Sequence, residues 1–145
     1  MNGSEWVVEA YGCDPVRLGD VGALGQVFDA LVEELSLHPV GNPLWHRFPM
    51  PGGVTGMLML AESHLTVHTF PEHASLCVNL FCCTARKDWD WSSRLAELVG
   101  ATDVRVRRLE RVYALEDGRW EMGDGRRSDL QRLPSPVSIL PSESP

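Results

Sequence analysis

Apolar and polar residues alternate along several short runs of the chain, which is the pattern of strands with one buried face. In the run 64–70, Leu65 and Val67 alternate with polar residues. The run 75–83 is apolar almost throughout, so we expect it to be a strand near the centre of its sheet. Strands are predicted at residues 5–12, 44–48, 54–60, 64–70, 75–83 and 102–113.

Two longer segments, residues 20–37 and 88–100, have apolar residues at helical spacing. The apolar face of the first comprises Val21, Leu24, Phe28, Leu31 and Leu35, and that of the second comprises Trp91, Leu95 and Leu98. Asp20 has the side chain of an N-cap, and Gly100 is the residue type that commonly ends a helix. The pattern therefore predicts two amphipathic helices.

The predicted order of elements, β-α-β-β-β-β-α-β, favours an α+β fold: a two-layer α/β unit with a largely antiparallel sheet and both helices on one face. A single layer of helices leaves the other face of the sheet uncovered unless a second sheet packs there. Two copies of the chain, packed face to face, would cover it. Topology alone therefore predicts a homodimer.

All of these elements fall within residues 1–113, which we expect to form one domain. The composition changes from about Ala114 onward, where "LPSPVSILPSESP" is rich in proline and serine and has no sustained periodicity. Such a segment buries too little apolar surface to fold by itself. Residues 114–145 are therefore predicted to be a poorly ordered C-terminal extension.

Charge and hydropathy narrow the choice of partners. The 145-residue chain has a formal net charge of −7, which argues against nucleic acid as its main partner. A basic cluster in the last strand, interpreted as a solvated strand face, comprises Arg105, Arg107, Arg108 and Arg111. No run reaches the roughly 18 apolar residues of a membrane span, and the first residues lack the pattern of a signal peptide. We therefore expect a cytoplasmic protein with no membrane partner and with free thiols at its four cysteines.

Residues that could carry chemistry gather around "AESHLTVHTFPE" (61–72), where Ser63 stands between a carboxylate and a histidine at a strand corner. The candidates are Glu62, Ser63, His64, His68, His73, Cys77, Cys82 and Cys83. From the residues alone, four interpretations stay open. They are ordinary hairpin and core residues, a zinc site, a nucleophile with its base, and a serine that attacks its own backbone.

Spacing argues against the zinc site, and a missing motif argues against the nucleophile with its base. On an extended strand His64 and His68 stand about 13 Å apart, too far for one metal ion. The adjacent Cys82 and Cys83 point to opposite sheet faces, so we expect no metal. Ser63 or Cys83 could act as a nucleophile with His68 as base, but the chain lacks the Gly-x-Ser-x-Gly elbow of many hydrolases.

The fourth interpretation makes Ser63 the source of a cofactor. In a strained corner its hydroxyl can attack the carbonyl of Glu62 and convert the amide into an ester. Loss of the Ser63 α-proton and β-elimination then cut the chain, and the new N-terminus hydrolyses to a pyruvoyl group. The ketone of that group can form a Schiff base with an amine substrate and serve as an electron sink for decarboxylation. The chain has a single lysine, Lys87, and so one weak candidate for a lysine Schiff base.

The same stretch closely resembles the bacterial and archaeal S-adenosylmethionine decarboxylases, which are pyruvoyl-dependent proenzymes. Their pattern is close to S-E-S-H-L-[AT]-I-H-T-W-P-E, followed by a strand that ends D-[LV]-F-T-C-G; this chain has "AESHLTVHTFPE" and "NLFCC". The likeness extends more loosely over residues 5–113. It implies a two-layer unit that dimerises through its sheets into an α-β-β-α sandwich. It also implies that neither metal nor pyridoxal phosphate is needed.

Position by position, the resemblance implies a processing role for four residues. Glu62–Ser63 is the cleavage site, which divides the chain into residues 1–62 and 63–145, and Ser63 becomes the pyruvoyl group. His68 promotes loss of the Ser63 α-proton. Thr55, where the family commonly has serine, supports processing through its hydroxyl.

The resemblance also implies how substrate is bound and protonated. Cys83 donates the proton that quenches the carbanion after carbon dioxide leaves. Phe48 and Phe70 stack the adenine, and Glu72 holds the ribose hydroxyls; Phe70 stands where the family usually has tryptophan. The expected reaction is decarboxylation of S-adenosylmethionine to supply aminopropyl groups for spermidine synthesis.

Several positions near the expected pocket differ from the family pattern. Asn79 replaces an aspartate, and "CCT" at 82–84 replaces "TCG". Two alternatives therefore stay open beside the first hypothesis. One is a pyruvoyl-dependent decarboxylase of another amino acid, such as ornithine or arginine. The other is a non-processing, non-catalytic homologue that acts by binding a partner.

Overall fold

The computed structural model describes residues 2–113. In chain order its elements are β1 (Asn2–Tyr11), α1 (Pro15–Leu18), α2 (Val21–Glu34), β2 (Leu44–Arg47), β3 (Val54–Leu60), β4 (Ser63–Phe70), the 3-10 turn η1 (Pro71–His73), β5 (Ser75–Cys82), α3 (Trp91–Val99) and β6 (Asp103–Val112). The predicted order of strands and helices is confirmed, with α1 and η1 as additions. The expected C-terminal extension, residues 114–145, lies outside the described residues.

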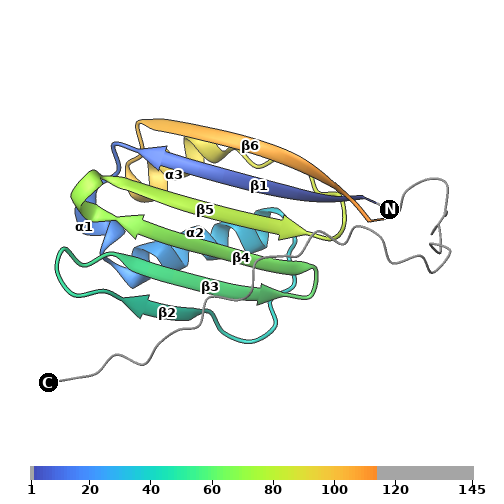
Figure 1. Ribbon diagram of the computed structural model, residues 1–145, viewed down its shortest axis with the longest axis horizontal. Coiled ribbons are helices and arrows are strands. Elements are labelled where there is room, and N and C mark those ends of the chain that lie inside the picture. Colours follow the sequence, from blue (N-terminus) through green and yellow to red (C-terminus); the bar gives the residue numbers. More distant parts are fainter. Residues whose placement is uncertain (1, 114–145) are drawn as a thin grey trace, which may run out of the picture. The chain divides into compact units, whose positions relative to one another are not determined.

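The strands form one sheet in the order β2-β3-β4-β5-β1-β6, and every neighbouring pair is antiparallel (Figure 1). β5 lies between β4 and β1, so the strand expected at the centre is central. The α+β class predicted from the order of elements is therefore confirmed.

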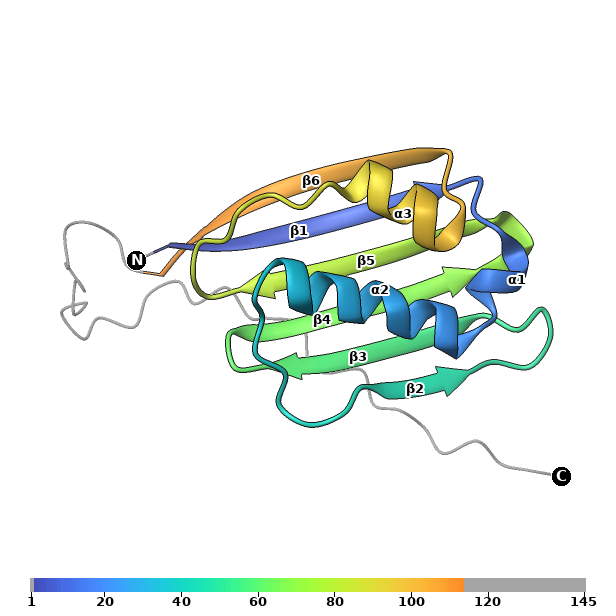
Figure 2. The same ribbon diagram turned by 180° about the vertical axis from the view of Figure 1, so that it is seen from behind.

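Helices α2 and α3 both cross the same face of the sheet (Figure 2). Alternate strand residues, among them Trp6, Leu65 and Leu80, are buried on that side and pack with Phe28 of α2 and Leu95 of α3. This apolar layer is the hydrophobic core, whose burial is the main favourable contribution to folding. The opposite side of the sheet, the open face, has no helix over it within residues 2–113 (Figure 1).

Capping residues and turns determine where the helices begin and end. The Asp20 carboxylate accepts a hydrogen bond from the Gly22 N–H at 2.8 Å, and Gly100 ends α3 with a φ of 75°, both as predicted. α2 stops at Glu34 rather than at residue 37, because the chain turns through Ser36, whose φ is 52°. α3 begins at Trp91, later than the pattern suggested, because Asp90 is its N-cap.

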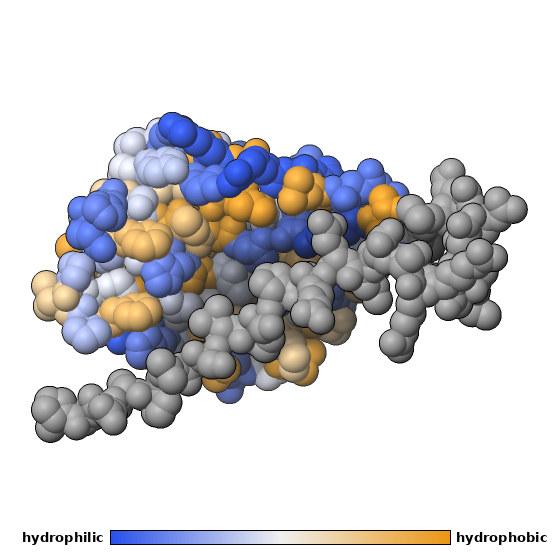
Figure 3. Space-filling model, in the orientation of Figure 1, coloured by the Kyte–Doolittle hydropathy of each residue, from blue (hydrophilic) through white to orange (hydrophobic). Residues whose placement is uncertain are grey.

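The open face mixes polar and apolar side chains (Figure 3). Met57 and Met59 of β3 are 52% and 58% exposed. On this face, ion pairs join Arg105 to Asp103, Arg107 to Glu9 and Arg111 to Glu5. Arg108 lies on the helix side of β6, where it contacts the Trp6 ring and pairs with Asp88, so the four arginines do not share one strand face as predicted. Each arginine of the basic cluster thus has a carboxylate partner within the fold, which lowers the positive potential that the cluster would otherwise present.

Among residues 2–113, no helix has both the length and the apolar character that crossing a membrane requires.

Candidate active site on the sheet

The predicted cleavage site lies at the turn between β3 and β4. Leu60 pairs with Ser63, so Ala61 and Glu62 form the connection between the two strands. Ser63 has a φ of 152°, on the positive side of the φ range where residues other than glycine rarely lie. A serine in such a conformation stores backbone strain, which is typical of functional positions.

The carbonyl of Glu62, which precedes Ser63, is held by the next strand. Its oxygen accepts a hydrogen bond from the Cys83 N–H at 2.8 Å. A backbone N–H at this oxygen would also stabilise negative charge that develops there during nucleophilic attack on the carbonyl carbon. Strand pairing thus brings together three predicted residues, Glu62, Ser63 and Cys83.

The Glu62 side chain points inward and is clamped on two sides. It is 8% exposed, and it accepts hydrogen bonds from Nη2 of Arg86 at 2.7 Å and from the His38 N–H at 3.2 Å. The His38 ring is a further contact. Burial raises the pKa of Glu62, but the hydrogen bonds from His38 and Arg86 outweigh burial and leave the pKa below its ordinary value. The turn is therefore fixed by an ionised, buried carboxylate.

A second group of predicted residues lies toward the other end of β4. The Thr55 hydroxyl is 2.6 Å from Nδ1 of His68, its direct partner across β3 and β4. The His68 ring lies between Phe48 and Phe70, with ring centroids 5.6 Å and 4.6 Å away. Glu72 follows in η1. Strand alternation places Thr55, His68 and Phe70 on the open face.

Four residues of this group, without Thr55, line a pocket of about 160 Å³. Its walls comprise Phe48, Pro49, Pro51, Gly53, His68, Thr69, Phe70 and Glu72. The two aromatic rings of this pocket can stack on a flat heterocycle, and its carboxylate can accept hydrogen bonds from a neighbouring group that carries hydroxyls. The structure therefore gathers the four residues predicted for substrate binding and proton removal, Phe48, His68, Phe70 and Glu72.

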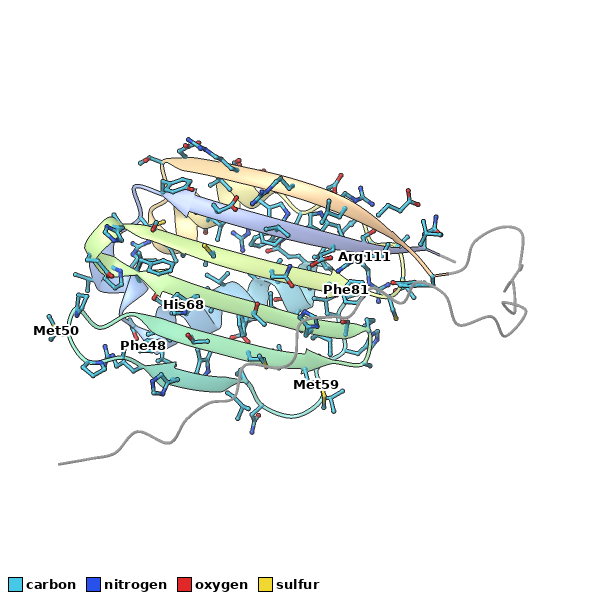
Figure 4. The ribbon with its side chains drawn as sticks, in the orientation of Figure 1. Phe48, Met50, Met59, His68, Phe81 and Arg111 are labelled. Atoms are coloured by element: carbon cyan, nitrogen blue, oxygen red, sulfur yellow. The ribbon has the colours of Figure 1, made fainter. Side chains whose placement is uncertain are left out.

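The two groups are not brought together within one chain. Ser63 begins β4 and His68 lies five residues farther along, which is about 16 Å on an extended strand. Figure 4 shows this separation: His68 and Phe48 lie toward one end of the sheet, and Phe81, which neighbours the Ser63 turn, lies toward the other. The His68 of a chain cannot reach the α-proton of the same chain's Ser63 in this arrangement.

Contacts around Ser63 include residues to which the sequence alone gave no role. Ser63 Oγ lies 3.1 Å from Nδ1 of His64, and His64 Nε2 lies 3.2 Å from Oδ1 of Asn79. His64 could have been suspected because it follows the serine directly. Asn79 stood out in the sequence only as a departure from the family pattern. Its contact with His64, and that of Arg86 with Glu62, could not be foreseen, because both depend on how the chain at and after β5 lies beside β4.

The thiols divide as strand alternation requires. Cys82 is fully buried on the helix side, and burial raises its pKa to about 11. Cys83 is exposed. Within residues 2–113 no three His, Cys, Asp or Glu side chains are close enough to bind one metal ion.

Comparison with known proteins identifies the family of the chain. The family model described as S-adenosylmethionine decarboxylase matches residues 4–112. S-adenosylmethionine decarboxylase proenzyme 2 of Halalkalibacterium halodurans is 35% identical over 111 residues, which cover 75% of this chain and 85% of that protein. The proenzyme of Moorella thermoacetica is 32% identical over 110 residues, covering 75% and 86%.

Among solved structures, the fold is similar to that of the adenosylmethionine decarboxylase from Aquifex aeolicus. The TM-score is 0.63 at 24% sequence identity, and the match covers 79% of this chain and 93% of that one. At that identity the likeness supports the fold, whereas the family model and the relatives above 30% identity support descent. The chain therefore belongs to the S-adenosylmethionine decarboxylase family.

Proposed function

We propose that this chain is a self-processing, pyruvoyl-dependent decarboxylase of S-adenosylmethionine. It cleaves itself between Glu62 and Ser63 into segments 1–62 and 63–145. Its product supplies aminopropyl groups for spermidine synthesis in the cytoplasm. The observation that carries the proposal is the strained Ser63 backbone beside a Glu62 carbonyl that already accepts the Cys83 N–H.

The residues at the turn fit a cofactor made from serine. The hydroxyl is on the residue after the carbonyl that it must attack, and a positive φ raises the energy of the intact peptide relative to the relaxed products. A pyruvoyl group supplies a ketone that binds the substrate amine and draws off the electron pair left by decarboxylation.

We assign the remaining steps to side chains on the open face. His68, whose Nδ1 is paired with the Thr55 hydroxyl, takes the Ser63 α-proton that must leave before the chain is cut. Thr55 orients that ring. Cys83, exposed next to the turn, returns a proton to the substrate carbon after carbon dioxide has left.

The pocket favours an adenosyl substrate over ornithine or arginine. Phe48 and Phe70 offer aromatic surfaces on which adenine can stack, and they also suit the cationic sulfonium. The Glu72 carboxylate can accept hydrogen bonds from both ribose hydroxyls. Ornithine and arginine have neither an adenine nor a ribose, and would leave the two aromatic rings and the Glu72 carboxylate without a partner.

The distance along β4 leads us to propose a homodimer with composite sites. Because His68 stands about 16 Å from Ser63 of the same chain, it must serve Ser63 of a second copy. The open face, with Met57 and Met59 exposed, is the surface on which a second sheet can pack. Two processed protomers would then form an α-β-β-α sandwich with two equivalent sites.

Intact-mass analysis of freshly purified protein tests the proposal. We expect two fragments that divide before Ser63, the larger with a carbonyl that reacts with hydrazide reagents, and carbon dioxide release from S-adenosylmethionine. Ser63→Ala should leave one chain, no reactive carbonyl and no decarboxylation. Turnover by Ser63→Ala, or a wild-type protein that is folded, whole and without a carbonyl, would refute the proposed function.

A further inference from the structure

A row of hydrogen-bonding groups leads away from Ser63 on the open face. Ser63 Oγ is 3.1 Å from His64 Nδ1, and His64 Nε2 is 3.2 Å from Asn79 Oδ1. These contacts join the start of β4 to the middle of β5. The row connects the attacking oxygen of the proposed self-cleavage to a base and to a group that fixes that base.

The orientation of the Asn79 amide follows from its other partners. Its Nδ2 donates to Oε1 of Glu5 at 3.0 Å and to the backbone carbonyl of Trp6 at 3.4 Å. A carbonyl oxygen can only accept. The Glu5 carboxylate also accepts, since the Asn79 hydrogen bond and Arg111 together outweigh burial and keep the pKa of Glu5 below its ordinary value. Asn79 must therefore present its amide nitrogen to β1 and its oxygen to His64.

That orientation selects one tautomer of His64. Asn79 Oδ1 accepts, so His64 Nε2 carries the proton and donates it. The other ring nitrogen, Nδ1, then keeps a free lone pair, and this is the atom that faces Ser63 Oγ. The ring also packs edge to face on Phe81, at 5.8 Å between centroids, which restricts its rotation.

We propose that His64 is the general base of the first step of self-cleavage and that Asn79 is its positioning residue. The inference rests on the proposed function and adds to it a residue with a defined step. His68 cannot take this role in the same chain, because it lies about 16 Å from Ser63 and its Nδ1 is engaged by Thr55. The two histidines thus serve successive steps.

The step is an isomerisation and needs no oxidant or other reactant. Ser63 Oγ forms a bond to the Glu62 carbonyl carbon as its proton passes to His64 Nδ1. The electron pair of the C=O bond moves onto the oxygen, which accepts the Cys83 N–H. When the carbonyl re-forms, the bond to the Ser63 nitrogen breaks, and His64 returns the proton to that nitrogen. The product is an ester with a free amine.

Trapping separates the two steps. Hydroxylamine cleaves an ester but not the amide, so the species that accumulates in each variant reports where processing stops. His64→Ala should accumulate the hydroxylamine-resistant amide, with processing about 10²- to 10⁴-fold slower than wild type, the contribution of a general base. His68→Ala should accumulate the hydroxylamine-sensitive ester.

Two controls keep the test decisive if His64→Ala folds poorly. His64→Asn keeps a polar atom near the position of Nδ1 without its basicity, and should stall in the same way while its circular dichroism and Tm match those of Ser63→Ala. Added imidazole should accelerate cleavage of His64→Ala. Accumulation of the amide in His68→Ala, or processing of folded His64→Asn at the wild-type rate, would overturn the inference.

Asn79 is tested through the tautomer that it selects. In uncleaved Ser63→Ala protein, ¹⁵N NMR of the His64 ring should show the proton on Nε2. Adding Asn79→Leu should shift the population toward the Nδ1-protonated form, and Asn79→Leu alone should slow processing. An unchanged tautomer would remove the role of Asn79. If wild-type protein itself never cleaves, the proposed function fails; if it cleaves and only the His64 results disagree, this inference alone fails.

Discussion

The four cysteines differ in how far their thiols are removed from solvent. Cys13 and Cys82 are buried, and burial raises the pKa of each to about 11. Cys83 is exposed on the side of the sheet that carries the proposed site. Its neighbour Cys82 points into the core, which makes it a poor substitute as proton donor.

Alkylation should reproduce this difference. With iodoacetamide at pH 8, folded protein should be labelled rapidly at Cys83. Cys82 and Cys13 should react far more slowly, because both are buried and burial raises the pKa of each to about 11. Peptide mass mapping over time measures the rate at each cysteine separately. Cys83→Ser is the control that removes the label at Cys83, while Cys77, which is also exposed within the chain, keeps its own. Fast modification of Cys82 in folded protein would contradict the burial described here.

At the scale of elements, Glu62 ties the β3–β4 turn to two other segments. Arg86 follows β5, and His38 follows α2; both contact the same buried carboxylate. Since the folded-state pKa of Glu62 is lowered, its contribution to stability is present above the pKa of the unfolded chain, near 4.5, and is lost as pH falls through the folded value. The contacts of Glu62 with Arg86 and His38 should therefore stabilise the fold less in acid.

Urea unfolding of uncleaved Ser63→Ala protein should show this dependence. The free energy of unfolding should fall as pH is lowered below about 4.5, and adding Glu62→Gln should make that fall smaller. Glu62→Gln should also destabilise the protein at pH 7, because Arg86 then lacks a charged partner. Glu97→Gln, at an exposed carboxylate of α3, is the control for the loss of one negative charge. Equal curves for Glu62→Gln and its parent would contradict the role given to Glu62.

The pattern of apolar and polar residues predicts the six strands and the two longer helices, but not every element of the fold. Alternation located β3 and β4 because one sheet face is buried and the other is not. α1 spans four residues, too few for a periodicity to be seen, and its position depends on the Asp14 cap. Strand register could not be predicted, because it is set by contacts between distant segments. The sequence therefore marks Asn79 as a departure from the family pattern but does not show that it is a partner of His64.

For the whole molecule, the sequence grouped residues that the fold separates. Ser63 and His68 are close in sequence and share a motif, yet an extended strand carries them apart. Cys83, twenty positions from Ser63, is instead adjacent to the turn through strand pairing. A motif on a strand thus identifies the participants of a reaction without showing that they act in the same chain.

Composite sites predict that two inactive variants restore activity to each other. If Ser63→Ala and His68→Ala chains are co-expressed, a mixed dimer has one site built from an intact Ser63 and an intact His68. Random pairing makes half of the dimers mixed, each with one of two sites active, so activity should approach about a quarter of the wild-type value. Differently tagged chains allow the mixed dimer to be isolated and its cleavage and carbon dioxide release to be measured.

The matched control pairs two variants from the same end of the sheet. Ser63 and Cys83 should come from one chain, because the Cys83 N–H contacts the carbonyl of Glu62, which we propose that Ser63 attacks. Ser63→Ala with Cys83→Ala should therefore restore no more decarboxylation than Cys83→Ala alone, since the only cleavable chain lacks the proton donor. Restoration by this pair would mean that Cys83 serves the Ser63 of the other chain. Absence of restoration in mixed dimers of Ser63→Ala and His68→Ala would mean that each site is complete within one chain and that β4 must bend to bring His68 to Ser63.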